Sequence, residues 1–243
     1  MIADTDFTYV IDFDGTVTTN DISSELAAYY GGTTYNEIEE KYRRREIPIK
    51  EWLRQIVKVL PPDLKSLLSK SLLWAEIRPG FNDFLDHARE MKSTIVIASD
   101  GFGFYIEPIL DQFNLLEKID FIYRNDTIIS EEGTLKIINP HAHTICPVCG
   151  NCKASHVLKS KKAGKPVIYV GDGSNDRFGA FWSDLIWARD RLAEACKKHH
   201  IYYSPWNDFY DIIKLEKPVL KDCSDHSLCL PDGRGIKEKY AME

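Results

Sequence analysis

The sequence predicts an α/β fold: a three-layer, Rossmann-like parallel sheet with helices on both faces and a small helical cap inserted after the first strand. Short, continuous apolar runs alternate with segments in which apolar residues recur at helical spacing. Continuous apolar runs are typical of parallel strands that are buried on both faces. A long helical stretch separates the first apolar run from the others. With 243 residues, 44% of them hydrophobic, the chain can form one large domain or a core with an insertion.

The N-terminal third predicts one strand followed by a helical insertion. Residues 7–13 are apolar, β-rich and bounded by polar residues, which indicates a buried strand. From 21 to 74, apolar and charged residues recur at helical spacing, with a break at Pro61-Pro62 that separates two helices. We therefore expect a core formed by 1–20 and 76–216, a helical cap at 21–75, and a charged tail at 217–243.

The remaining chain alternates between strands and helices. Glu132-Gly133 lies between two β-rich runs, so a hairpin is expected over 127–138. The tail is irregular and is expected to be partly loose. Further strands are predicted at 94–98, 119–123, 167–170 and 185–187, and helices at 81–91, 102–113, 175–182 and 192–198.

Composition limits the classes of partner. A net charge of −6 argues against a broad nucleic-acid or anionic-membrane surface. No apolar run approaches the ~20 residues that span a bilayer, and the N-terminus has no signal-like segment. We expect a cytoplasmic protein without nucleic-acid or membrane partners, whose six cysteines are thiols or metal ligands. The sequence leaves a homodimer open.

Polar residues of four segments are predicted to meet at one edge of the sheet. Ligands bind beyond the carboxyl ends of strands in open α/β sheets. Asp12 and Asp14 end the first strand, Ser99 follows the second, Asp172 follows the fourth, and Lys153 begins a predicted helix. Each has a plain alternative as a turn, helix-cap or surface residue, whereas the ordered series favours chemistry.

Asp12-Phe13-Asp14-Gly15-Thr16, Ser99, Lys153 and Gly171-Asp172 with Asp176 resemble the four motifs of the haloacid dehalogenase superfamily of phosphatases. The resemblance runs from Tyr9 to Asp176, and the helical insertion resembles the cap of the phosphoserine-phosphatase-like branch. It implies a Mg²⁺-dependent phosphatase that hydrolyses a small phosphorylated metabolite through an aspartyl-phosphate.

The resemblance also assigns roles to residues of this chain. Asp12 is the expected nucleophile, and Asp14 the acid that protonates the leaving oxygen and then the base that activates water. The expected Mg²⁺ ligands are Asp12, Asp172 and the backbone carbonyl of Asp14, and Asp176 is expected to orient metal-bound water or Lys153. The expected phosphate-binding residues are Ser99, Gly101, Lys153 and Asn175, with Lys153 also counted as catalytic.

A cysteine-rich segment precedes Lys153. Cys146, Cys149 and Cys152 have C-x₂-C-x₂-C spacing, which is compatible with structural Zn²⁺. The alternative is a set of reduced thiols that frame the loop. The fourth zinc ligand would be His143 or one of the tail residues Cys223, His226 and Cys229.

The cysteine-rich segment, together with 187–190, Cys196 and 204–210, resembles the methionine-salvage phosphatases that act on 2-hydroxy-3-keto-5-methylthiopentenyl-1-phosphate. Phosphocholine and phosphoethanolamine phosphatases also share the cysteine-rich segment. Phosphoserine phosphatases use a cap carboxylate and a cap arginine; Asp21 and Arg54 lie near those places, but Ile56 occupies the arginine register.

Cap side chains are expected to contact the leaving group and so to set specificity. A distant alternative to an enzyme is a non-catalytic phosphoacceptor or binding protein on the same fold. The candidates for specificity are Glu25, Tyr29, Tyr30, Tyr42, Arg43, Trp52 and Arg54.

Overall fold

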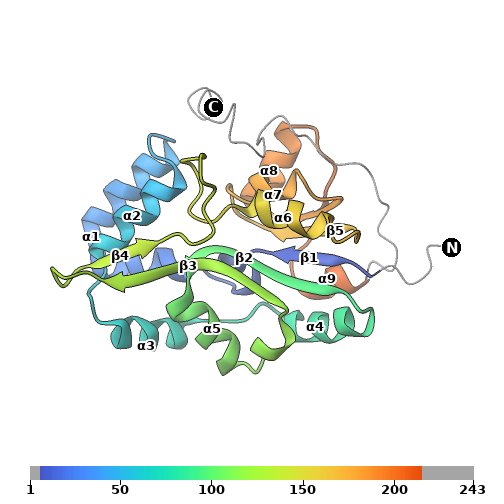
Figure 1. Ribbon diagram of the computed structural model, residues 1–243, viewed down its shortest axis with the longest axis horizontal. Coiled ribbons are helices and arrows are strands. Elements are labelled where there is room, and N and C mark those ends of the chain that lie inside the picture. The colour runs from blue at the N-terminus through green and yellow to red at the C-terminus, as the bar shows by residue number, and fades with distance from the viewer. Residues whose placement is uncertain (1–5, 215–243) are drawn as a thin grey trace.

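The computed structural model describes residues 6–214, which form a seven-stranded sheet with helices on both faces (Figure 1). The strand order is β4-β3-β2-β1-β5-β6-β7, and every pair is parallel except the antiparallel pair β3 and β4. The predicted α/β class is confirmed. The strands are β1 (Thr8–Ile11), β2 (Thr94–Phe102), β3 (Phe121–Ile129), β4 (Leu135–Ile138), β5 (Val167–Gly171), β6 (Leu185–Ala188) and β7 (Ser204–Pro205).

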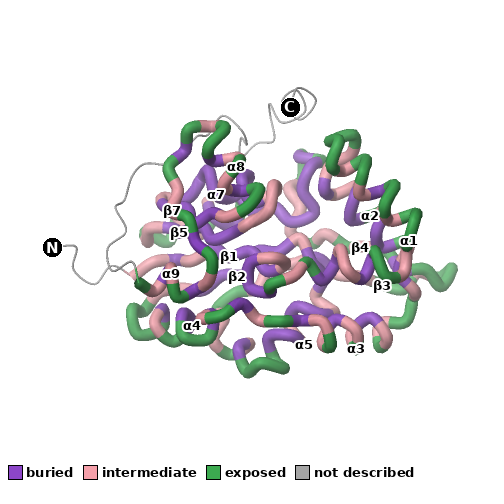
Figure 2. Tube along the Cα trace, turned by 180° about the vertical axis from the view of Figure 1, so that it is seen from behind, coloured by how far each residue is buried: buried purple, intermediate pink, exposed green. Residues whose placement is uncertain are grey.

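Successive side chains of the central strands enter two different cores, because side chains alternate between the faces of a sheet. Ile11 packs in the core beneath α4 (Phe81–Glu90) and α5 (Gly103–Gln112). Val10 packs in the opposite core with α6 (Lys153–Lys161), α7 (Arg177–Ala180) and α8 (Asp190–Lys198). Figure 2 shows the buried residues along the strands and the inner helix faces, with exposed residues outside.

Three helices follow β1 and form the insertion: α1 (Ile22–Arg43), α2 (Ile49–Val59) and α3 (Leu64–Trp74). The Asp21 carboxylate accepts a hydrogen bond from the Ser24 amide at 2.8 Å, and Asp63 does the same for Ser66 at 3.2 Å. Both aspartates therefore cap helix N-termini. Among the residues described, no helix is long and apolar enough to cross a membrane.

The structure refines several element boundaries. The predicted third strand and the first arm of the hairpin are one strand, β3, which pairs with β2 and then with β4. Strand β2 runs beyond the apolar segment to Phe102, with a register shift between Ala98 and Phe102. The helix predicted over 175–182 is only the short α7. Strand β7 and helix α9 (Phe209–Lys214) were not predicted, and the tail at 217–243 lies outside the described residues.

Candidate active site

All eight residues predicted for catalysis, metal binding and phosphate binding line one cavity of about 390 Å³ between the sheet edge and α1 and α2. Parallel strands β1, β2 and β5 deliver most of them at their carboxyl ends, as the fold class predicts. The roles given to these residues above stay predictions. The eight are Asp12, Asp14, Ser99, Gly101, Lys153, Asp172, Asn175 and Asp176.

Lys153 is a buried ammonium between two carboxylates. Its Nζ lies 2.7 Å from Asp12 Oδ1 and 2.6 Å from Asp176 Oδ1, and the side chain is 4% exposed. Burial acts to lower the pKa of Lys153, but the two carboxylates raise it well above its ordinary value. Lys153 is therefore a fixed positive charge beside Asp12.

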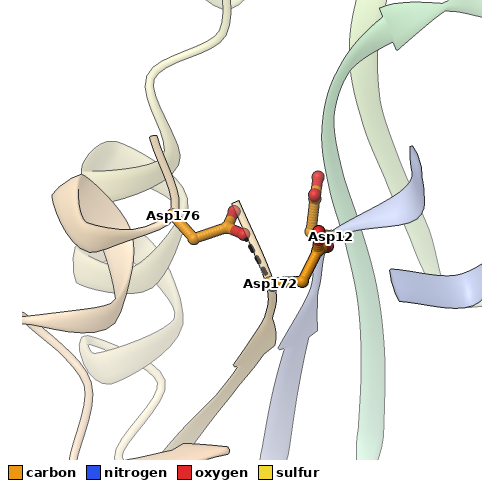
Figure 3. Close-up of side chains that lie close together, drawn as sticks. All are labelled: Asp12, Asp172 and Asp176. Atoms are coloured by element: carbon orange, nitrogen blue, oxygen red, sulfur yellow. Dashed lines mark hydrogen bonds between the residues drawn. The ribbon is translucent and has the colours of Figure 1, made fainter. Parts of the chain in front are cut away.

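Three carboxylates lie close together at this site, and two of them contact the Lys153 ammonium. Asp12, Asp172 and Asp176 each offer an oxygen within 4.8 Å of the others (Figure 3). Burial and then the charge of Asp176 raise the pKa of Asp12 well above its usual range, and the same two causes raise that of Asp172 to about 7. The excess negative charge fits a hard divalent cation, whose preferred ligands are carboxylate oxygens.

Asp176 differs from the other two carboxylates because its oxygens already accept several hydrogen bonds. They accept from the Asp172 amide at 3.0 Å, which is the dashed line in Figure 3. They also accept from the Gly173 amide at 2.7 Å, Tyr169 at 2.8 Å and Lys153 at 2.6 Å. Asp176 is thus suited to orient Lys153 and the loop of Asp172, whereas Asp12 and Asp172 are better placed as metal ligands. The side chain of Asp14 is not in this group.

Asp14 has a different environment from Asp12. Its Oδ2 accepts a hydrogen bond from the Tyr105 hydroxyl at 2.6 Å, and its Oδ1 accepts one from the Ile22 amide at 3.1 Å. Burial, followed by the charge of Asp21, raises the pKa of Asp14 well above its ordinary value. The hydrogen bonds from Tyr105 and Ile22 act against this rise, because both stabilise the carboxylate. A raised pKa suits a general acid.

The predicted phosphate-binding residues share the cavity but have other partners. Ser99 Oγ accepts from the Gly101 amide at 2.9 Å, which holds the turn after the apolar part of β2. The Asn175 amide donates to the Tyr42 hydroxyl at 2.7 Å, so it connects the core to α1. A Cβ on Gly101 would lie 2.1 Å from the Tyr105 hydroxyl oxygen. Only a glycine fits at that position.

Sequence reasoning missed several residues of the cavity and its support. Tyr105 bonds to Asp14, Thr16 Oγ1 donates to Asp172 Oδ1 at 2.6 Å, and the Asn151 side-chain amide donates to Ser99 O at 2.7 Å. A tyrosine two residues into a helix carries no pattern that indicates such a contact. Thr16 belongs to the first motif, but its residue type alone does not indicate a hydrogen bond to Asp172. Glu39 and Tyr35 of α1 also line the cavity.

Of the seven predicted specificity residues, only Tyr42, Arg43 and Trp52 line the cavity. The other four have partners elsewhere. Tyr29 packs on Trp74, Tyr30 contacts Ser66, and Arg54 pairs with Glu51. Glu25 accepts a hydrogen bond from Asn20.

Of the two alternatives for the cysteine segment, the zinc site is not supported. Within residues 6–214, the one group of three or more potential ligands is Asp12, Asp172 and Asp176, so Cys146, Cys149, Cys152 and His143 do not gather around a common point. His143 Nδ1 instead accepts hydrogen bonds from the amides of Ile145 and Cys146, at 3.3 and 3.2 Å. Cys223, His226 and Cys229 lie outside the described residues.

The sequence is similar to known phosphatases. The family model described as Putative Phosphatase matches residues 7–182. A Bacillus cereus protein (strain ATCC 10987) named 2-hydroxy-3-keto-5-methylthiopentenyl-1-phosphate phosphatase is 31% identical over 212 residues, 86% of this chain and 95% of the relative. A Bacillus anthracis protein of the same name is 31% identical over 213 residues, with the same shares covered.

Solved structures share the fold. A phosphoserine phosphatase described as a phospho-aspartyl intermediate analogue has a TM-score of 0.66 at 18% identity, covering 88% of this chain and 99% of the other. A haloacid dehalogenase family hydrolase of Salmonella enterica serovar Typhi has a TM-score of 0.69 at 16% identity, covering 88% and 72%. The chain has the fold of these enzymes, belongs to the Putative Phosphatase family and is a phosphoric monoester hydrolase.

Proposed function

We propose that the chain is a Mg²⁺-dependent phosphatase that transfers a phosphoryl group from a small phosphomonoester to Asp12 and then to water. One observation supports this proposal: two carboxyl groups, Asp12 and Asp14, share a cavity but have different partners. Asp12 contacts the Lys153 ammonium, whereas Asp14 accepts hydrogen bonds from the Tyr105 hydroxyl and the Ile22 amide. Such a division supplies a nucleophile and a general acid.

The proposed reaction has two steps. An Asp12 carboxylate oxygen bonds to phosphorus while the bond to the leaving oxygen breaks, and Asp14 gives its proton to that oxygen. Ionised Asp14 then takes a proton from the water that attacks the aspartyl-phosphate, which releases phosphate and restores both side chains. Lys153 balances charge throughout, and Mg²⁺ held by Asp12 and Asp172 would offset the negative charge of the phosphoryl oxygens.

We further propose that the helical insertion is the cap, at 21–75 against a core of 1–20 and 76–216, and that it selects the leaving group. Aromatic and aliphatic side chains line the cavity on the cap side. An apolar thioether chain suits this wall, since sulfur contacts aromatic rings favourably. We therefore propose the enol phosphate named for the Bacillus relatives as the substrate. The wall consists of Tyr35, Tyr42, Ile49, Trp52 and Leu53.

A second candidate is a phosphomonoester with a cationic leaving group, such as phosphocholine or phosphoethanolamine. Glu39 Oε2 accepts a hydrogen bond from Trp52 Nε1 at 3.0 Å, which places a carboxylate beside an indole in the cavity wall. Ammonium groups bind to such aromatic and acidic surroundings. Phosphoserine has weaker support, because Arg54 does not line the cavity.

The test is a hydrolysis panel with Mg²⁺ that contains the enol phosphate, phosphocholine, phosphoethanolamine and phosphoserine. We expect phosphate release from the enol phosphate, with Asp12→Asn abolishing turnover and Asp14→Asn lowering it by about 10²- to 10⁴-fold. No hydrolysis of any member would contradict the proposed reaction. A lasting phosphorylated protein without turnover would support the phosphoacceptor alternative.

Glu39→Gln discriminates between the two substrate classes. A cationic leaving group loses its counter-charge, so kcat/KM falls about tenfold or more, whereas a neutral thioether is affected little. Glu39 also pairs with Arg43 at 2.9 Å, so the control is Glu40→Gln, whose partner Arg44 has the same spacing and lies outside the cavity. Equal effects of the two variants on phosphocholine would exclude this role for Glu39.

A further inference from the structure

Arg78 is a buried arginine whose side chain bonds to backbone carbonyls. It lies between α3 and α4 and is 8% exposed. Its Nε donates to Thr16 O at 2.8 Å, and its Nη2 donates to Gly15 O at 2.5 Å and Thr18 O at 3.3 Å. Nη1 donates to Asn207 O at 3.4 Å. The guanidinium thus joins the loop after β1 to the segment before α9.

The loop that Arg78 holds forms one wall of the Asp172 site. Thr16 Oγ1 donates to Asp172 Oδ1 at 2.6 Å. Gly15 has a φ of +82°, and a Cβ on it would lie 2.7 Å from Asp172 Oδ2. The same loop connects Asp14 to α1. A shift of residues 15–18 would therefore displace both Asp14 and the Asp172 carboxylate.

Arg78 itself is absent from the cavity lining, so it has no direct route to substrate. Its planar fork contacts three carbonyl oxygens of the loop at once, those of Gly15, Thr16 and Thr18, which a lysine ammonium on a flexible chain does not reproduce. A buried charge used in this way costs desolvation free energy that a neutral side chain would avoid. This cost makes a purely space-filling role a poor explanation.

We propose that Arg78 is a positioning residue, which fixes residues 15–18 so that Asp14 and Asp172 keep their productive places. The proposal rests on the proposed function, but it also predicts a property independent of turnover, the affinity of the resting protein for Mg²⁺. Misplacement of a reacting group by about 1 Å can lower a rate about 10²-fold. Loss of a residue that orients a metal ligand typically weakens metal binding about 10- to 100-fold.

The test compares Arg78→Met and Arg78→Lys with Arg189→Met. Arg189 is a matched control because it also lies over the Trp206 ring, at 5.6 Å against 5.4 Å for Arg78, and donates to Asn207 O at 3.0 Å. Within the described residues, the Arg189 side chain bonds to Asp190 and Asn207 and not to residues 15–18. Mg²⁺ affinity is measured by calorimetry below the unfolding transition of each variant, alongside kcat, KM and the melting temperature.

We expect Arg78→Met to lose about 10²-fold in kcat, with KM within roughly threefold, and about 10- to 100-fold in Mg²⁺ affinity. Arg189→Met should keep wild-type values of both, even if its melting temperature falls. In Arg78→Ala, added guanidinium should restore part of the activity and urea should not. A folded Arg78→Met protein with wild-type Mg²⁺ affinity and kcat overturns the proposal.

If Arg78→Met does not fold, Arg78→Lys decides the matter by the same two measurements. Wild-type kcat and Mg²⁺ affinity in folded Arg78→Lys would show that three simultaneous carbonyl contacts are unnecessary. If the wild-type protein hydrolyses no substrate, the proposed function fails, while the Mg²⁺ calorimetry still tests Arg78. The two failures are therefore distinguishable.

Discussion

A buried histidine beneath the site should make the stability of the protein depend on pH. His156 lies in α6, is 5% exposed, and stacks on Tyr123 with ring centroids 4.0 Å apart. Its Nε2 is 2.5 Å from Asn151 Oδ1. The Asn151 amide nitrogen donates to Ser99 O and Tyr123 O, so its oxygen is the acceptor and His156 carries the proton on Nε2.

Burial, followed by the charge of His141, lowers the pKa of His156 from 6.5 to about 3. The folded protein therefore favours the neutral imidazole of His156, and the contribution of this residue to the free energy of unfolding is complete above pH 6.5. As the pH falls below 6.5, the unfolded chain binds a proton that the folded protein does not, so stability is lost progressively down to about pH 3. At pH 5 the loss is about 2 kcal/mol relative to pH 8, from 1.36 kcal/mol per tenfold change.

Urea unfolding at pH 8, 6.5 and 5 measures this loss, with His156→Gln as the variant and exposed His200→Gln as the control. Raised pKa values at Asp12 and Asp14 act in the opposite direction, so the quantity of interest is the wild-type minus variant difference. That difference should shrink by about 2 kcal/mol from pH 8 to pH 5 for His156→Gln, and the His200→Gln series shows what replacing an exposed histidine does. A constant difference for His156→Gln would refute the argument.

Three further outcomes are expected. Gly101→Ala places a methyl group against Asp14 Oδ2 and the Tyr105 hydroxyl, so it should destabilise the fold by about 1–3 kcal/mol in thermal unfolding and lower kcat by displacing the Asp14 carboxyl. Lys153→Met leaves the Asp12 carboxylate buried without its ammonium and should cost about 3–5 kcal/mol in urea unfolding. EDTA should abolish phosphate release and lower the melting temperature, both restored by Mg²⁺, because the cation offsets clustered carboxylates; unchanged values would contradict a resident metal.

The sequence was sufficient to predict that the candidate catalytic, metal-binding and phosphate-binding residues share a cavity, but not which cap residues line it. Asp12 and Lys153 are 141 positions apart, yet Nζ and Oδ1 are within 2.7 Å. The prediction succeeded because apolar runs locate parallel strands, and parallel strands present their carboxyl ends at one edge. Fold class and motif order together were enough to bring these two charges into one place.

The contacts that hold these residues in position were not predictable. Tyr105 resembles any core aromatic at helical spacing, and only the approach of α5 to the loop after β1 places its hydroxyl on Asp14. Helix α9 is six residues long, too short for a periodic signal, and packs through Phe209 against Phe81 and Phe84. Arg78 stands beside Pro79-Gly80 and reads as part of a turn. Long-range packing decides each case.

The cysteine segment agrees with the second of its two interpretations, reduced thiols that frame the loop before Lys153. Cys146, Cys149 and Cys152 are buried together with Val148 in the core on the α6 side of the sheet, as small apolar side chains. Between them the segment places Asn151, which donates to Ser99 O at 2.7 Å and to Asp100 Oδ1 through its backbone amide at 3.2 Å.

Two residues after Asn151 comes Lys153, whose ammonium lies beside Asp12. The buried thiols thus anchor a turn whose polar residues connect β2 to the start of α6. His156 of that helix donates a hydrogen bond to the Asn151 side-chain oxygen. Replacing one of these buried cysteines by alanine should therefore lower stability according to the volume removed, whereas serine adds the cost of burying a hydroxyl. The segment acts on the site by holding buried Lys153 at the start of α6.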